Sequence, residues 1–323
     1  MVLQVVFGDK KLSLSVVIVN WNTGLLLQRC VSSLLEHGRG CEIIVVDNAS
    51  EDASLEFLAA RETPIVVLRN GENMGFAAAC NQGWRSSQGS LVLFLNPDTE
   101  AFGDSVPPLV YALDQHKEAW AASGQLISDS RQPQRQYAPL GFPTLASVRA
   151  EAYLLDEIWP ANPWTCRRPR LKLGNNAVYE VDQPAAACLL VKRCALESLG
   201  GFDEDFRPAW FEDVDFCRRI QARGGKILFV PKARFLHRGG VSLQHLGKES
   251  FLKHFHSNQI RYFKKHHGND IAERVRGILI AGLYLRAGIS LLVPLMPGAS
   301  RIECAKAFCR IARHVAAFRG GSQ

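Results

Sequence analysis

The chain has 323 residues, of which 47% are hydrophobic and 21% are charged, and its formal net charge at pH 7 is +7. This composition excludes a disordered or fibrous chain, and it predicts a folded protein with one large core or a domain plus an appendage. The basic balance suits an anionic partner, such as anionic lipid or a phosphorylated substrate. Because the chain lacks zinc-finger and RNA-recognition signatures, we expect no nucleic acid as a partner.

The cysteines and the N-terminal stretch both bear on cellular location. The nine cysteines form an odd set without a Cys-x-x-Cys pair, and several lie inside apolar runs. This pattern favours reduced, buried thiols in the cytosol over a disulfide framework or a zinc site. The stretch MVLQVVFGDKK has its charges after a short apolar run, the reverse of a secretory signal peptide. We therefore expect a cytoplasmic protein.

Four short β-rich runs alternate with helical patterns over residues 1–125. The expected strands lie at residues 14–22, 42–50, 64–70 and 90–98. The expected helices lie at residues 24–37, from near residue 52, at 75–84 and at 106–116. Strands that alternate with helices in this way indicate βαβ units on a parallel sheet. The first 125 residues are therefore predicted to be doubly wound α/β.

The second half of the chain is less regular. Residues 128–179 are rich in Pro, Arg and Gln, and their periodicity does not favour helix or strand, so we interpret them as an extended connection or a substrate lid. Beyond them, the patterns predict a strand, a short helix and a glycine turn at 184–206, a helix at 211–225 and a strand from residue 226. A basic helix is predicted at 250–267.

The C-terminal region combines apolar and basic patterns. Residues 278–296 are almost all apolar, but Arg286 lies at their centre. Because a central Arg costs on the order of 2.5–3.5 kcal/mol in a bilayer, we expect an interfacial hairpin or a docked helix rather than a membrane span. Residues 301–319 predict an amphipathic helix that suits either an anionic membrane surface or packing on the core. Its apolar face comprises Ile302, Ala305, Phe308, Ile311, Val315 and Phe318.

Polar side chains follow the ends of all four predicted strands. They are Asn20 and Asn22, Asp47 and Asn48, Asn73, and Asn96 and Asp98. A single Asx residue is an ordinary turn former, and Asp98 taken alone favours loop capping over a ligand site. Four equivalent positions at the carboxyl edge of one parallel sheet favour a site that binds a ribose or a base. Gly-x-Gly-x-x-Gly after the first strand and a P-loop are both missing, which disfavours a dinucleotide oxidoreductase and a P-loop nucleotidase.

The stretch PAWFEDVDFCRRI contains a second acidic cluster. On a helix, Asp215 faces Arg218 and Arg219 at i+3 and i+4, which indicates a structural ion pair. Asp213 has no helical counter-charge and lies beside aromatic residues, so it is a candidate general base. The alternative is a first-turn acid that stabilises its helix.

Six motifs occur in one order along the chain: VIVNWN, VVDNASED, NMGFAAACNQG, LFLNPDT, GGFDEDF and FEDVDFCRRIQARGGKILFVPKARFLHRGG. Together they resemble the family 2 inverting glycosyltransferases, and within them the bacterial rhamnosyltransferase-like group. The resemblance covers roughly residues 14–240 and implies a GT-A-type α/β fold, doubly wound with a mostly parallel sheet. We accordingly predict a catalytic domain at 1–249, with a nucleotide-binding half at 1–125 and an acceptor-binding half at 126–249. Residues 250–323 would be a helical, membrane-associating appendage.

The resemblance also implies roles for individual residues. Asp213 corresponds to the general base. Asp98 corresponds to the last acid of the Asp-x-Asp motif, which holds Mg²⁺ or Mn²⁺ against the pyrophosphate, and His237 matches a metal-binding histidine. Asn96 stands where many relatives carry the first Asp, which weakens the metal site. The expected nucleotide-sugar site comprises Asn20, Asn22, Asp47, Asn73, Gly75, Asn96 and Asp98, and the expected acceptor site comprises Trp210 and Glu212.

The implied reaction is transfer of rhamnose from dTDP-rhamnose to a hydroxyl of a polyprenyl-diphosphate-linked or polysaccharide acceptor in cell-surface glycan synthesis. UDP- and GDP-sugars stay open as donors. A non-catalytic nucleotide-sugar-binding scaffold and, more weakly, a nucleotidyltransferase are the alternative functions. The basic, apolar tail and an anionic lipid acceptor predict a protein peripheral to the inner face of the cytoplasmic membrane. A homo-oligomer is one of the states that the sequence leaves open.

Overall fold

The structure is a computed structural model that describes residues 4–7, 10–37, 40–60, 65–159, 162–164, 176–239, 246–293 and 299–319. Its contacts divide the chain into two compact units. The sheet unit comprises Met1–Leu140, Pro169–Glu204 and Glu212–Val241. The helical unit comprises Gly141–Arg168, Asp205–Phe211 and Ser242–Gln323. The helical unit thus includes residues 141–168, 205–211 and 242–249 of the predicted acceptor-binding half as well as the C-terminal region.

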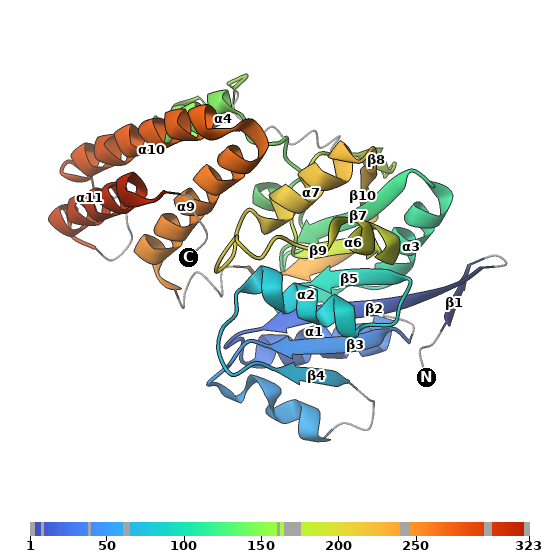
Figure 1. Ribbon diagram of the computed structural model, residues 1–323. Coiled ribbons are helices and arrows are strands. Elements are labelled where there is room, and N and C mark those ends of the chain that lie inside the picture. Colours follow the sequence, from blue (N-terminus) through green and yellow to red (C-terminus); the bar gives the residue numbers. More distant parts are fainter. Residues whose placement is uncertain are drawn as a thin grey trace. The chain divides into compact units, whose positions relative to one another are not determined.

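The sheet unit is built on one mixed sheet (Figure 1). Its strands are β1 (Gln4–Phe7), β2 (Lys10–Asn20), β3 (Glu42–Asp47), β4 (Val66–Arg69), β5 (Leu91–Leu95), β6 (Thr99–Ala101), β7 (Ala119–Ile127), β8 (Tyr179–Glu180), β9 (Cys188–Lys192) and β10 (Lys226–His237). The main order is β4-β3-β2-β5-β9-β7-β10-β6, with β1 paired to β2 and β8 paired to β10. The predicted strands β2 to β5 are parallel, as expected, and β7 pairs with β10 in parallel.

One strand departs from the parallel pattern. β9 lies between β5 and β7 and is antiparallel to both. Four of its five residues are buried, like those of its parallel neighbours. A buried apolar run reads the same for either strand direction, so the sequence did not reveal this reversal.

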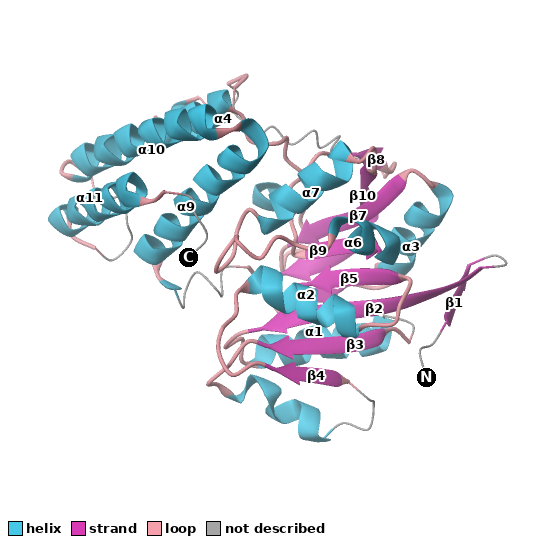
Figure 2. Cartoon of the chain, in the orientation of Figure 1, coloured by secondary structure: helices cyan, strands magenta, loops and turns pink. Residues whose placement is uncertain are grey.

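Helices cover both faces of the sheet (Figure 2). Those of the sheet unit are α1 (Leu25–His37), α2 (Phe76–Ser86), α3 (Val106–Gln115), α6 (Arg193–Leu199) and α7 (Glu212–Ala222), with 3₁₀ turns η1 (Ala53–Ala60) and η2 (Arg135–Tyr137). The helix expected near residue 52 is thus a 3₁₀ turn. α1 and α3 share a core with Val16 and Ile18 of β2. The intervening Val17 faces α2, where a Cβ on Gly83 would lie 2.3 Å from Val17 Cγ1, so this close approach requires glycine.

The helical unit contains α4 (Leu145–Ala152), α5 (Leu155–Ile158), α9 (Lys248–His267), α10 (Asn269–Ser290) and α11 (Arg301–Ala317). Of the predicted apolar face of α11, Phe308, Ile311 and Val315 are buried, and α11 contacts α9 and α10. Ile302, by contrast, is 61% exposed. Of the two interpretations of this amphipathic helix, the structure therefore supports packing within the unit.

The arginine inside the apolar run has a structural partner. Arg286 of α10 donates to the carbonyls of Ala152, at 2.5 Å, and Glu151, at 2.7 Å, at the C-terminal end of α4. Burial lowers the pKa of Arg286, and nearby acids oppose that effect. The described helices include none that combines the length and apolar character needed to cross a membrane. The predicted docked helix is therefore the arrangement observed for α10 up to Ser290.

The segment interpreted as an extended connection or a substrate lid contains η2, α4 and α5. α4 begins with a capping box in which Ser147 N–H donates to Thr144 Oγ1 at 3.1 Å and Thr144 N–H donates to Ser147 Oγ at 2.9 Å. Such a box is readable in sequence as a helix start, although Ser at the fourth position is a weaker signal than Glu or Gln. The interpretation as an extended connection is therefore wrong for these residues, and the substrate lid stays a prediction.

Candidate functional site

The polar residues after β2 and β3 lie together, as expected for neighbouring parallel strands. Asn20 and Asp47 are partners in the register of these strands. The buried side chain of Asn20 donates to Asp47 Oδ1 at 2.8 Å and to Ser54 Oγ at 2.8 Å. Asn22 adopts a left-handed backbone (φ 52°), and its Oδ1 accepts from the Glu51 N–H at 2.7 Å. These side chains fix the two loops that follow β2 and β3.

Asn48 fixes the next loop along the sheet edge. Its Nδ2 donates to Asn73 Oδ1 at 2.9 Å, and its Oδ1 accepts from Asn70 Nδ2 at 3.0 Å and from the Met74 N–H at 3.2 Å. Gly75, at the start of α2, has φ 88° and donates its N–H to Asn73 Oδ1 at 3.0 Å. Asn73 and Gly75 are therefore held in one network by Asn48, a residue whose organising role the sequence pattern did not single out.

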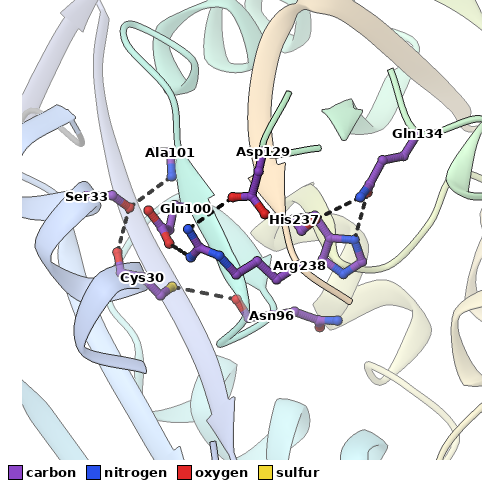
Figure 3. Close-up of polar contacts among 9 residues, drawn as sticks. All are labelled: Cys30, Ser33, Asn96, Glu100, Ala101, Asp129, Gln134, His237 and Arg238. Carbon is purple, nitrogen blue, oxygen red and sulfur yellow. Dashed lines mark hydrogen bonds and ion pairs between the residues drawn. The ribbon is translucent and has the colours of Figure 1, made fainter. Parts of the chain in front are cut away.

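The turn that carries Asp98 is anchored from two sides. The Asn96 N–H donates to the Ala187 carbonyl at 3.0 Å, and the Asn96 carbonyl accepts from the Thr99 N–H at 3.1 Å. The Cys30 thiol of α1 donates to the same carbonyl at 3.6 Å (Figure 3). Burial and the neighbouring acids raise the pKa of Cys30, so it remains a neutral thiol donor. The buried strand β5 thus ends in a rigid turn.

Asp98 and His237 meet at this turn. β6 and β10 are antiparallel, with His237 opposite Thr99, and the Asp98 carbonyl accepts from the Arg238 N–H at 3.0 Å. His237 Nε2 lies 3.5 Å from Asp98 Oδ1. Both residues are buried, with exposed fractions of 4% and 7%. Burial lowers the pKa of His237, although the charge of Asp98 acts in the opposite direction.

The buried pair has the character of a divalent-metal site. Asp98 Oδ1 receives no hydrogen bond from any residue that the structure describes. A buried acceptor without a donor is costly, and a cation bound between a carboxylate oxygen and an imidazole nitrogen would satisfy both. Across the described ranges, no cluster of three or more His, Cys, Asp or Glu side chains could hold a metal ion. The residues present therefore fit a cation with two protein ligands and further oxygen ligands from outside the protein.

The acidic cluster lies in the first turn of α7. Asp213 Oδ1 accepts a hydrogen bond from the Val214 N–H at 2.8 Å, and the backbones of Val214, Asp213 and Ala186 act to lower the pKa of this carboxylate. Burial raises the pKa of Asp213 despite these effects. Glu212 is only 4% exposed, and burial and the charge of Asp213 raise its pKa. Asp215 is paired with Arg219 at 2.7 Å, which confirms the predicted structural role of that aspartate.

The loop before α7 is strained and is held by α9. Trp210 and Phe211 both have φ 74°, a region that non-glycine residues rarely occupy. The buried side chain of Asn258 donates to the carbonyls of Arg207, at 3.2 Å, Ala209, at 2.9 Å, and Trp210, at 3.1 Å. The Trp210 ring, predicted to contact the acceptor, packs edge-on against Phe251 at 4.7 Å between centroids. Asn258 is a supporting residue that sequence reasoning missed.

Comparison with known proteins agrees with the motifs. Residues 15–165 match the family described as Glycosyl transferase family 2. Over 270 residues, 79% of this chain and 85% of the relative, the chain is 28% identical to an N-acetylglucosaminyl-diphospho-decaprenol L-rhamnosyltransferase of Mycobacterium tuberculosis. These matches confirm the resemblance to family 2 glycosyltransferases and to their rhamnosyltransferase-like group.

Solved structures confirm the fold class. The chain is similar to GalNAc-T7 with UDP, GalNAc and Mn²⁺, with a TM-score of 0.62 and 18% identity, over 94% of this chain and 55% of that chain. It is also similar to the mannosyltransferase PcManGT from Pyrobaculum calidifontis with GDP-Man and Mn²⁺, with a TM-score of 0.58 and 15% identity, over 96% of this chain and 89% of that chain. At these identities the likeness establishes the shared GT-A-type α/β fold. Glycosyltransferase is the activity class that the family match and the mycobacterial relative have in common.

Proposed function

We propose that the chain transfers rhamnose from dTDP-rhamnose to a hydroxyl of a polyprenyl-diphosphate-linked acceptor, with inversion at the anomeric carbon. The observation that carries this proposal is the buried Asp98–His237 pair after β5 and at the end of β10. Asp98 Oδ1 in this pair receives no hydrogen bond from any described residue. Asp213 supports the proposal because the backbone of Ala186, which acts to lower the pKa of Asp213, lies next in sequence to the residue that anchors the Asn96 turn.

The residues of the chain supply defined parts of this reaction. Asp98 and His237 would hold Mg²⁺ or Mn²⁺, which when bound supplies positive charge that stabilises the leaving nucleoside diphosphate. Asp213 takes the proton of the acceptor hydroxyl as the hydroxyl oxygen forms its bond to the anomeric carbon. The bond from that carbon to the diphosphate oxygen breaks in the same displacement, so the configuration inverts. A carboxylate whose pKa is raised by burial suits this proton transfer.

The substrate assignments rest on the mycobacterial relative. Its name specifies L-rhamnosyl transfer and a diphospho-decaprenol-linked acceptor. We assign the nucleotide-sugar site to the edge formed by Asn20, Asn22, Asp47, Asn73, Gly75, Asn96 and Asp98, and the acceptor site to Trp210 and Glu212. With a lipid-linked acceptor, the chain would act at the inner face of the cytoplasmic membrane, as a peripheral protein.

Thermal unfolding of the full chain with dTDP, UDP and GDP, each with and without Mn²⁺, tests the donor and the metal together. A nucleotide at 100 times its Kd stabilises the folded state by about 2.7 kcal/mol. We expect a rise in Tm with dTDP that requires Mn²⁺. Asp98→Asn should abolish the Mn²⁺-dependent part, whereas Asp104→Asn, an exposed acid of the following loop, should preserve it.

The other outcomes have distinct meanings. A metal-dependent rise with UDP or GDP alone would overturn the dTDP-sugar assignment and retain a nucleotide-sugar enzyme. No rise with any nucleotide, in folded protein, would contradict donor binding as a whole. Nucleotide binding without transfer of rhamnose to a GlcNAc-diphosphate-polyprenol would instead favour the nucleotide-sugar-binding scaffold.

A further inference from the structure

Gln134 makes two hydrogen bonds to the same residue, His237 (Figure 3). Its Nε2 donates to the backbone carbonyl of His237 at 2.8 Å. Its Oε1 lies 3.1 Å from the ring nitrogen Nδ1 of His237. The side-chain amide thus spans the backbone and the ring of one histidine.

The backbone carbonyl determines which way the amide of Gln134 faces. A carbonyl oxygen only accepts hydrogen bonds, so the NH₂ group of Gln134 must point to it, and Oε1 must then point to the ring. Because Oε1 also only accepts, the proton of the neutral imidazole lies on Nδ1. The lone pair on Nε2 is then available on the side of the ring that faces Asp98 Oδ1, 3.5 Å away.

The chain around Gln134 is itself fixed. The Gln134 N–H donates to the Leu126 carbonyl at 3.0 Å, which ties the residue to β7. Three residues later, the Tyr137 ring packs edge-on against the His237 ring, with centroids 4.6 Å apart. Arg238 forms ion pairs with Glu100 and with Asp129, the latter at 3.3 Å (Figure 3). These pairs join the end of β10 to β6 and to the turn after β7. Gln134 therefore has little freedom to release the ring.

From this geometry we propose that Gln134 is a positioning residue that holds His237 in the Nδ1–H tautomer, with Nε2 aimed at the Asp98 carboxylate for a divalent cation. The inference rests on the proposed function for the identity of the ligand, but the tautomer itself does not. Partners that bind the remote N–H of a metal-binding histidine typically contribute a factor of about 10–100 to metal affinity. A purely structural role for Gln134 would stabilise the end of β10 without affecting the tautomer.

Two variants separate these roles. Gln134→Met removes both hydrogen-bonding groups at similar length. Gln134→Glu retains an acceptor for Nδ1–H but loses the donor to the His237 carbonyl, so it should reduce stability while preserving the tautomer. Gln132→Met, in the same turn and exposed, is the matched control.

The first readout is the ¹⁵N spectrum of the histidine rings in the metal-free full chain, with the His237 signals assigned by their loss in His237→Gln. We expect Nδ1–H in the wild type, in Gln134→Glu and in Gln132→Met, and a shift toward Nε2–H in Gln134→Met. An Nε2–H tautomer in the wild type, or an unchanged tautomer in Gln134→Met, would overturn the inference.

The second readout is the Kd for Mn²⁺ in the presence of dTDP, from the paramagnetic resonance signal of free Mn²⁺. Gln134→Met should bind Mn²⁺ about 10–100-fold more weakly than the wild type, and Gln134→Glu should bind within a few fold of it. Equal weakening in both variants would contradict positioning and indicate a structural role. A wild type that binds no Mn²⁺ would count against the proposed function, while the ring spectra would still decide the tautomer.

Discussion

The backbone of Ala186 lies close enough to the carboxylate of Asp213 to lower the pKa of that carboxylate. The next residue, Ala187, uses its carbonyl to bind the N–H of Asn96, two residues before Asp98. The segment that leads into the antiparallel strand β9 therefore joins the proposed general base to the turn of the proposed metal ligand. This connection requires β9 to run antiparallel beside β5, since its amino end then lies next to the carboxyl end of β5.

Substituting the proposed base should lower activity without lowering stability. Asp213→Asn removes the proton acceptor, so we expect the rate of sugar transfer to fall about 10²–10⁴-fold. It also removes a carboxylate whose ionised form is disfavoured by burial, so Tm at pH 7 should stay unchanged or rise.

Asp215→Asn is the matched control on the same helix. It breaks the buried pair with Arg219, and loss of one partner of such a pair costs on the order of 3–5 kcal/mol. The control should therefore lose Tm. A transfer rate in Asp213→Asn that equals that of the wild type would show that another group accepts the proton.

The pH dependence of the reaction should report the raised pKa of Asp213. The base must be ionised, so kcat/KM should fall as the pH is lowered through a pKa above the ordinary aspartate value of about 3.9. Because the folded state binds this proton more tightly than the unfolded state, the contribution of Asp213 to stability decreases as the pH rises through the same window. Profiles of kcat/KM against pH test the predicted fall in rate at low pH, and unfolding curves test the predicted fall in stability at high pH. A rate that falls only at or below about pH 4 would contradict a raised pKa for the base.

The helical unit should gain stability as the pH rises from about 4 toward neutrality. Burial lowers the pKa of His256 to about 4, and Arg286 adds to this effect while a hydrogen bond with Gln259 opposes it. The unfolded chain therefore binds more protons than the folded chain between about pH 4 and the ordinary histidine pKa of about 6.5, so stability is lost as the pH falls through that range. His256→Gln should show a flatter Tm profile over this range than the wild type, and an equally steep profile would refute the assignment.

Asn258→Ala should destabilise the loop before α7. The substitution leaves the carbonyls of Arg207, Ala209 and Trp210 without their shared donor, at a cost of about 1–3 kcal/mol for a buried group left unsatisfied. Lys264→Ala, at an exposed position of α9, should change stability by less than about 0.5 kcal/mol. Urea unfolding of the two variants measures the difference. Equal free energies of unfolding would show that the loop keeps its backbone conformation without Asn258.

Sequence could identify the residues that stand at strand ends but not those that orient them. Asp98 and Asn20 follow buried apolar runs, so their positions at the sheet edge could be predicted from local pattern alone. Gln134 bonds to a residue 103 positions later, within a segment that has no periodicity. Asn258 bonds to a loop about fifty positions earlier in the chain. Such long-range partners leave no local signal.

The C-terminal helices show the same limit for packing. An amphipathic pattern predicts that one face of a helix will be buried, but it does not identify the surface that covers this face. In α11 the burying surface is α9 and α10, so Phe308 and Ile311 are core residues. Contact between the helical unit and a membrane would therefore have to come from apolar residues outside this core, namely those with exposed side chains.

The exposed apolar residues after α10 should carry membrane binding. Leu291, Leu292 and Val293 follow α10 directly, and Leu292 is 73% exposed. Burial of a Leu side chain contributes about 1.5–3 kcal/mol, so Leu291→Ser with Leu292→Ser should weaken binding to anionic phospholipid vesicles at least tenfold. Tyr111→Ser, an exposed apolar site on α3, is the control and should bind like the wild type. Sedimentation of the full chain with vesicles measures the partition. A double variant that still sediments fully would exclude this surface, and a wild type that stays in the supernatant would exclude peripheral binding to such lipids.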